Sequence, residues 1–185
     1  MKSRSQARKR PDKFEHFLNR AKVAAEMSTC LRRRIGAIIV KDGVEVSSGY
    51  VGSPRGTAHC IDTGKCLRKE LGIPPGERYE LCRSVHAEQN AIINAARTGV
   101  SIVGGEMYLS SERNKDAYDG SRGENDRIYG PCMICKKLII NAGITKVHMR
   151  ERGVGVKSYD IKELKELLAQ EEDKIRESLR PKKGE

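Results

Sequence analysis

Two short motifs far apart in the sequence constrain this chain more than any other feature. His86 stands two residues before Glu88 in the stretch SVHAEQNAI, and Cys132 stands three residues before Cys135 in the stretch GPCMIC. The chain holds only four histidines and six cysteines. We expect His86, Cys132 and Cys135 to meet at one zinc ion, because one imidazole and two thiolates are typical zinc ligands. The fold must therefore bring distant segments together.

The sequence predicts that each motif stands at the start of a helix. Apolar residues after Val85 follow helical spacing, and Pro131 opens the stretch PCMICKKLIINAG, which Gly143 can end. The positive end of a helix favours thiolates over thiols. Three protein ligands leave the fourth position of zinc for water, whose pKa can fall from ~15.7 to about 7. Glu88 is then placed to carry the proton of that water to a substrate.

Each half of this pattern also has a simpler explanation. His86 could be a structural histidine, and the two cysteines could be a buried pair or could bind a structural zinc ion. The combination with Glu88 and Pro131 favours a catalytic zinc, because a structural zinc ion has no use for a proton carrier.

The remaining sequence alternates between helical and strand patterns. Apolar spacing predicts a first helix from Pro11 to Cys30, and the hairpin RIGAIIV–KDG–VEVSSGY predicts two strands. A long connection rich in glycine and proline follows, from Val51 to Leu81. EMYLS and TKVHMR predict two more strands, and a final helix is expected to start at Asp160. This order predicts an α/β sandwich around one mixed sheet.

Composition and charge indicate a globular protein of the cell interior. At 185 residues we expect a flexible basic arm (1–10), one main domain (11–158), and a C-terminal helix and tail (159–185). No apolar run approaches the ~18 residues of a membrane span, and the basic start lacks the apolar core of a secretory signal. We therefore expect a cytoplasmic protein with reduced thiols and no membrane partner. The net charge of +11 indicates a solubilising surface or an anionic partner.

Four stretches of the sequence resemble one enzyme family. HAEQNAI and PCMIC match the H-x-E…P-C-x-x-C pattern of zinc-dependent nucleobase deaminases. Together with IGAIIVKDGVEVSSGY and GYVGSPRG, they resemble the deoxycytidylate deaminase branch of the cytidine deaminase superfamily, over most of the chain. The resemblance implies a three-layer α/β/α sandwich with a central mixed five-stranded sheet. It also implies a homo-oligomeric enzyme that hydrolyses dCMP to dUMP and ammonia.

The resemblance also implies roles for individual residues. The backbone N–H of Ala87 would hold the pyrimidine carbonyl, and the carbonyl of Gly130 would accept a hydrogen bond from the amino group. Val51 stands where the family has asparagine, so we expect dCMP to be less well distinguished from CMP. For the phosphate we expect Arg34, before the first strand, and Arg55, in the glycine–proline loop. The polar stretch 111–130 is expected to be a surface loop.

The remaining cysteines suggest a second metal ion. Some deoxycytidylate deaminases carry a structural zinc near the long loop, and the positions that resemble its ligands are Cys30 and Cys60. A closed zinc site that also includes Cys66 and Cys82 would explain how this loop is held beside the active site. The alternative is that all four are small buried hydrophobic residues, since free cysteine is commonly buried.

Two other functions stay open at this point. A deaminase acting on tRNA or on single-stranded nucleic acid would use the basic arm for recruitment. Such proteins usually expose several aromatic residues for stacking, however, and this chain has few. The other function is a non-catalytic zinc-scaffold binding module, which would have no use for Glu88. We therefore favour a small nucleotide substrate over a nucleic acid.

Overall fold

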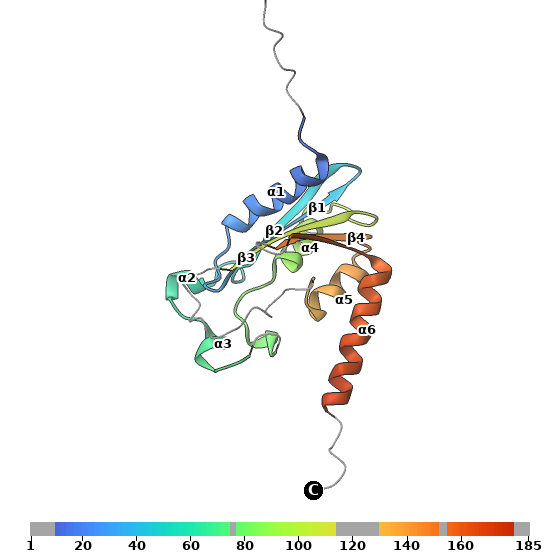
Figure 1. The fold of residues 1–185 in the computed structure, drawn as a ribbon. Coiled ribbons are helices and arrows are strands. Elements are labelled where there is room, and N and C mark those ends of the chain that lie inside the picture. The colour runs from blue at the N-terminus through green and yellow to red at the C-terminus, as the bar shows by residue number, and fades with distance from the viewer. Residues whose placement is uncertain (1–9, 75–76, 114–129, 152–154, 180–185) are drawn as a thin grey trace, which may run out of the picture.

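The computed structural model describes residues 10–74, 77–113, 130–151 and 155–179, which build one sheet with helices on both faces (Figure 1). The sheet has five strands: β1 (Arg33–Lys41), β2 (Val44–Tyr50), β3 (Glu106–Arg113), β4 (Lys146–Glu151) and β5 (Gly155–Asp160). Their order is β2-β1-β3-β4-β5. Strands β3 and β4 run parallel, and the other neighbouring pairs are antiparallel. The sheet is therefore mixed and five-stranded, as the resemblance implied.

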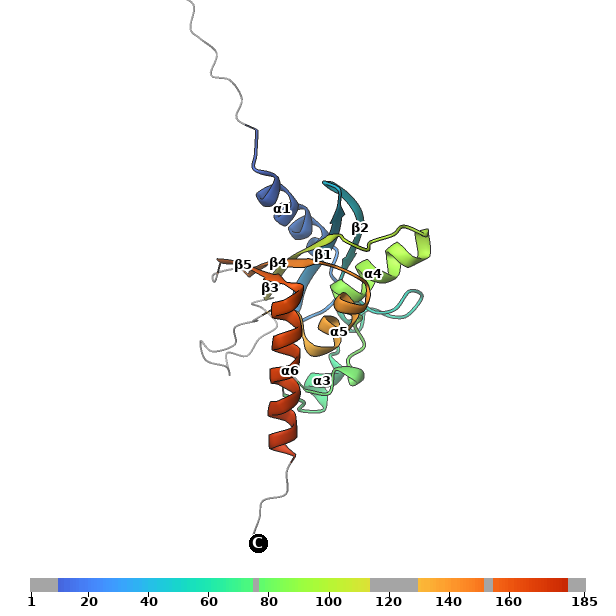
Figure 2. The same ribbon diagram turned by 90° about the vertical axis from the view of Figure 1, so that its right-hand side faces the viewer.

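Helices cover both faces of this sheet. Figures 1 and 2 show α1 on one side and α4, α5 and α6 on the other. The bounds of these helices are Lys13–Glu26, Ala87–Thr98, Met133–Asn141 and Ile161–Ser178, in chain order. The long connection after β2 contains three short helices: α2 (Cys60–Thr63), α3 (Leu67–Glu70) and η1 (Tyr79–Leu81). This arrangement confirms the predicted three-layer α/β/α sandwich.

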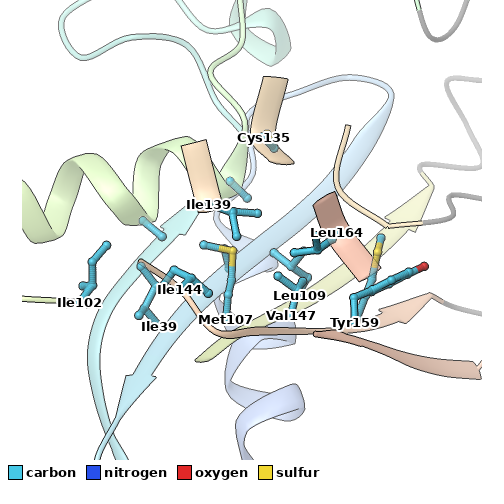
Figure 3. Packing of buried hydrophobic residues seen from close by; sticks show 14 of the residues in the cluster. Ile39, Ile102, Met107, Leu109, Cys135, Ile139, Ile144, Val147, Tyr159 and Leu164 are labelled. Carbon is cyan, nitrogen blue, oxygen red and sulfur yellow. The ribbon is translucent and has the colours of Figure 1, made fainter. Parts of the chain in front are cut away.

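The alternation of side chains along β1 divides the core between the two faces. Ile38 packs with Leu18 of α1, whereas Ala37 and Ile39 belong to a larger core on the opposite face. Figure 3 shows this larger core, to which the sheet, α5 and α6 contribute buried side chains, among them Ile39, Met107, Leu109, Cys135, Ile139, Val147 and Leu164. The metal-ligand candidate Cys135 is thus part of the main core.

Two glycines let helices lie directly on the sheet. A Cβ atom at Gly36 of β1 would come within 2.2 Å of the Ala21 carbonyl oxygen, and one at Gly49 of β2 within 2.3 Å of the Ala91 amide nitrogen. Any other residue would clash with backbone atoms at these positions, so α1 and α4 pack closely on the strands. The position of α4, and with it the position of His86, is therefore fixed by the sheet.

Three details differ from the sequence predictions. The stretch 111–130 is not all surface loop, because its first three residues continue strand β3 and Ser111 is only 3% exposed. The first helix ends at Glu26, so Cys30 lies beyond it in the connection to β1. The strand patterns predicted four strands and missed β5, whose residues are exposed except for Tyr159. An exposed edge strand lacks the alternation of buried and exposed residues on which strand prediction depends.

Other predictions concern the ends of helices and the membrane. Gly143 has φ +73° just after α5, and the Asp160 side chain accepts a hydrogen bond from the Glu163 N–H at 2.8 Å, so both predicted caps are confirmed. Across the described ranges, no helix combines the length and the apolar character that crossing a membrane requires. The basic arm and most of the stretch 111–130 lie outside the described residues.

Candidate active site

The starts of α4 and α5 bring the two motifs together. His86 is the N-cap residue of α4, Cys132 is the N-cap residue of α5, and Cys135 lies in the first turn of α5. The Gln89 side chain accepts a hydrogen bond from the His86 N–H at 2.9 Å. The residue before His86 exchanges two backbone hydrogen bonds with Gly52. The backbone of His86 is therefore held from both sides.

His86, Cys132 and Cys135 form a candidate metal-binding group, whose donor atoms lie close enough to hold one ion. The Nδ1 atom of His86 lies 3.4 Å from the Sγ of Cys132 and 3.3 Å from the Sγ of Cys135. Among the described residues, this is the one group of three or more potential ligands whose donor atoms all lie within 4.8 Å of one another. One nitrogen and two sulfur donors fit zinc, and a three-ligand set leaves a position for water or substrate.

The thiols of Cys132 and Cys135 differ in pKa. The hydrogen bond with Cys135 lowers the pKa of Cys132; burial opposes this shift and His86 supports it. The same hydrogen bond, together with burial, raises the pKa of Cys135. Cys132 therefore gives up its proton first, and zinc binding, which requires thiolates, displaces the proton of Cys135.

Glu88 lies inside the protein, with only 7% of the residue exposed. Burial raises the pKa of its carboxyl group; His86 opposes this shift and Cys132 adds to it. A carboxyl group with a raised pKa exchanges protons more readily near neutral pH. This environment suits a residue that takes up and releases protons during a reaction.

A cavity of about 480 Å³ lies beside these residues, a volume typical of small-molecule sites. Its lining includes His86, Glu88 and Cys132, together with Gly130, which the resemblance implied as a substrate contact. Ala87, the other implied backbone contact, has a fully buried side chain at the first position of α4. The cavity therefore joins two of the three predicted zinc ligands, the predicted proton carrier and one predicted substrate contact.

The arginines of the cavity are not the ones that the sequence suggested. Its lining includes Arg32, Arg33, Arg68 and Arg83, and neither Arg34 nor Arg55. Arg34 lies on the α1 face of β1, because strand side chains alternate and Ile38 marks that face. Arg55 is exposed and donates a hydrogen bond to the Asn94 Oδ1 at 2.7 Å. Arg33 lies on the other face of β1, which it shares with Ala37 and Ile39.

Two residues of the long connection pack toward the metal-binding group, and no sequence pattern predicted them. The Arg68 guanidinium lies 4.8 Å from the centre of the Tyr79 ring. Arg68 also donates hydrogen bonds to the carbonyl oxygens of Pro74 and Glu77, at 2.5 and 2.6 Å. The Tyr79 ring meets the His86 ring at 89°, with the ring centres 5.2 Å apart. The connection therefore encloses the cavity on the side of His86.

The remaining cysteines line the same cavity: Cys30, Cys60, Cys66 and Cys82. Burial raises the pKa of the Cys60 and Cys82 thiols, and the neighbouring thiols contribute to both shifts. Beside Cys60, the Nδ1 atom of His59 is buried and has no hydrogen-bond partner in the ranges that the structure covers. The structure thus brings these four thiols to one region of the cavity, but within the described ranges no three of them meet as closely as the donors of the first group.

Comparison with known proteins agrees with this geometry. A family model described as the cytidine and deoxycytidylate deaminase zinc-binding region matches residues 11–151. The chain belongs to this deaminase family. The matched region contains the hairpin, α4 and α5 with both motifs, and it ends before α6.

Individual relatives of this chain include viral, fungal and bacterial proteins. A protein of Mycobacterium phage D29 named deoxycytidylate deaminase is 34% identical, covering 75% of this chain and 94% of that protein. The deoxycytidylate deaminase of Schizosaccharomyces pombe is 30% identical, but the chain spans only 37% of its length. Among solved structures, the dCMP deaminase of cyanophage S-TIM5 in complex with dCMP and dUMP has 26% identity and a TM-score of 0.54. That alignment covers 88% of this chain and 94% of the cyanophage chain.

Proposed function

We propose that this protein hydrolyses dCMP to dUMP and ammonia. The observation that carries the proposal is the buried Glu88 beside the His86, Cys132 and Cys135 group, in a cavity lined by arginines. The relatives add support, since the phage D29 protein is named deoxycytidylate deaminase and the cyanophage structure holds dCMP and dUMP. Family membership supports zinc as the metal.

The site residues divide the chemistry between them. Zinc, held by the three ligands, would supply the acidity that makes a water molecule nucleophilic near neutral pH. Glu88 takes a proton from that water and delivers it to N3 of the cytosine ring. The oxygen of the water forms a bond to C4, and Glu88 then takes the remaining proton of this hydroxyl group and passes it to the amino group as the bond between C4 and that nitrogen breaks. One water is consumed, one ammonia leaves, and C4 gains a carbonyl oxygen.

The backbone at both helix starts orients the base. We assign the pyrimidine carbonyl to the N–H of Ala87 and the amino group to the carbonyl of Gly130. We assign the binding of the phosphate to the arginines that line the cavity, and Arg33 is the leading candidate among them. Arg33 lies on the strand face that carries the active site, and a guanidinium can make paired hydrogen bonds to phosphate oxygens.

Removing the phosphate from the substrate is expected to lower kcat/KM at least about tenfold. Charge-assisted hydrogen bonds from one or two arginines contribute ~1.5–3 kcal/mol each, and ~1.4 kcal/mol corresponds to a factor of ten. The measurement compares dCMP, CMP, deoxycytidine, cytidine and a cytosine-containing oligonucleotide on the purified protein. Because the Val51 side chain cannot hydrogen-bond to the sugar, we expect CMP to react at a rate closer to that of dCMP than to that of the nucleosides.

Substitutions at two neighbouring positions test which arginine binds the phosphate. Arg33→Gln should remove most of the preference for dCMP over deoxycytidine, whereas Arg34→Gln, on the opposite face of β1, should leave it intact. Equal rates on nucleosides and monophosphates would contradict a nucleotide substrate. Reaction of the oligonucleotide alone would favour a deaminase of nucleic acids, for which the net charge of +11 supplies a reason.

A second, structural zinc is part of the proposal. Cys30, Cys60, Cys66 and Cys82 are free thiols that line one region, and the buried Nδ1 of His59 is a further potential donor. Small movements of a loop without strands of its own would bring four such donors to one ion. A reducing compartment keeps thiols available for zinc, so we also place the protein in the cytoplasm, which cell fractionation would check.

A homo-oligomer is the expected assembly. A groove of about 400 Å³ runs past α4 and α5, and its lining includes Ile93, Ile134 and Leu138, which are 47%, 41% and 38% exposed. Exposed aliphatic residues grouped in this way are typical of protein interfaces. Ile93→Glu combined with Ile134→Glu is expected to lower the mass measured by analytical ultracentrifugation. A wild-type protein that sediments as a monomer at micromolar concentration would contradict this assembly.

A further inference from the structure

The helix α6 reaches the active-site cavity although it lies beyond the matched family region. Its side chain Glu171 belongs to the cavity lining, together with Glu88, Gly130 and Cys132. Leu164, near the start of α6, is fully buried in the main core and anchors the helix there. Figures 1 and 2 show α6 running alongside α5 and away from the sheet. A residue of α6 is therefore available to contact a bound substrate.

An ion pair fixes Glu171 at the wall of the cavity. Lys136 directly follows the ligand Cys135 and is only 1% exposed. Its Nζ atom lies 2.5 Å from the Oε1 of Glu171. The Glu171 side chain as a whole is 40% exposed, but its other oxygen, Oε2, is itself buried and has no hydrogen-bond partner among the residues that the structure describes. Lys136 thus satisfies one carboxylate oxygen and leaves the second as a positioned acceptor.

A buried acceptor without a partner is unfavourable, and a donor from a ligand would remove that cost. In a cytidine nucleotide the donors are the amino group and the sugar hydroxyls, while the phosphate would be repelled by a carboxylate. The proposed function already assigns the amino group to Gly130 and Glu88. The Val51 side chain, which also lines the cavity, offers no hydrogen bond. The sugar hydroxyls are the donors that remain.

We propose that Glu171 is a specificity-determining residue whose Oε2 accepts a hydrogen bond from a sugar hydroxyl of the substrate. This assignment rests on the proposed function for the identity of the nucleotide. The layout of the cavity agrees with it, because Arg33, the leading candidate for the phosphate, lies on β1, whereas Glu171 lies on α6. The phosphate and the sugar hydroxyl can then be held by groups of opposite charge on different walls.

The test compares substrates with and without the hydroxyl. Glu171→Gln is expected to lower kcat/KM for dCMP about tenfold, mainly through KM, and to leave kcat/KM for 2′,3′-dideoxycytidine monophosphate within about twofold. Glu172→Gln is the matched control, since the neighbouring Glu172 is half exposed and pairs with Lys137 at 3.7 Å. The kcat/KM of Glu172→Gln for each of the two substrates should equal that of the wild type.

A binding measurement separates this proposal from the proposed reaction. Calorimetry with dUMP and 2′,3′-dideoxyuridine monophosphate needs no turnover. Glu171→Gln should weaken the binding of dUMP about tenfold and leave the binding of the dideoxy nucleotide unchanged. If dUMP binds with this contrast but dCMP is not deaminated, the proposed reaction fails and the role of Glu171 stands. If neither nucleotide binds the wild type, both proposals fail.

A second variant excludes a purely structural role for the ion pair. The double substitution Lys136→Met and Glu171→Leu replaces the ion pair between the buried Lys136 and the partly exposed Glu171 with apolar groups of similar size, which proteins often tolerate. The folded double variant is expected to bind dUMP no better than the dideoxy nucleotide. The proposal would be overturned if the double variant bound dUMP more tightly than the dideoxy nucleotide, as the wild type is expected to do. It would also be overturned if Glu171→Gln lost the same affinity for both nucleotides.

Discussion

Glu88→Gln is expected to lower kcat by about 10²–10⁴-fold, the usual contribution of a general acid–base group. Glutamine has nearly the same shape as glutamate but cannot accept the proton of the water or pass it to the base. The zinc content should not change, because Glu88 is not one of the three ligands that the geometry brings together. Stopped assays of dCMP deamination measure kcat, and metal analysis of the same sample measures the zinc content.

The stability of this variant should be close to that of the wild type. Burial raises the pKa of the Glu88 carboxyl, so the neutral amide replaces a group that the protein already disfavours in its charged form. Glu70→Gln, at an exposed position of α3, controls for the loss of one acidic group. A Glu88→Gln protein with near-normal turnover and full zinc would show that another group carries the proton.

The sequence was most informative where function depends on local structure. A cysteine pair three residues apart, preceded by proline, predicts both a helix start and two sulfur ligands on one side of it. In the same way, the motif that contains His86 and Glu88 predicts the start of α4 and places both side chains there. These motifs predicted the metal-binding group before the fold was known, because each brings its own backbone geometry.

Features that depend on tertiary packing could not be read in this way. Arg33 and Arg34 look equivalent in the sequence, but a shift of one residue along a strand exchanges the two faces of the sheet. Lys136 and Glu171 stand on different helices, and no periodic pattern links them. The exposed strand β5 lacks an apolar alternation, so its pairing with β4 became visible only in the sheet.

Cys135→Ser is expected to remove the catalytic zinc and to lower dCMP turnover by at least about 10²-fold. Substitution of residues that merely hydrogen-bond to zinc ligands already costs ~10–100-fold in metal affinity or activity, so the loss of a ligand itself should cost more. Cys135 is fully buried in the main core, and serine is slightly smaller and more polar, so some loss of thermal stability should accompany the loss of zinc.

Cys66→Ser is the matched comparison, because it removes a thiol of the proposed structural site and leaves the catalytic ligands in place. We expect two zinc ions per wild-type chain and one in each variant, with activity lost only in Cys135→Ser. The stability of Cys66→Ser should fall through loosening of the long connection between β2 and α4. One zinc ion per wild-type chain, with four thiols that react in the native protein, would remove the structural site. A Cys135→Ser protein that keeps both zinc ions and its turnover would remove the proposed catalytic ligand set.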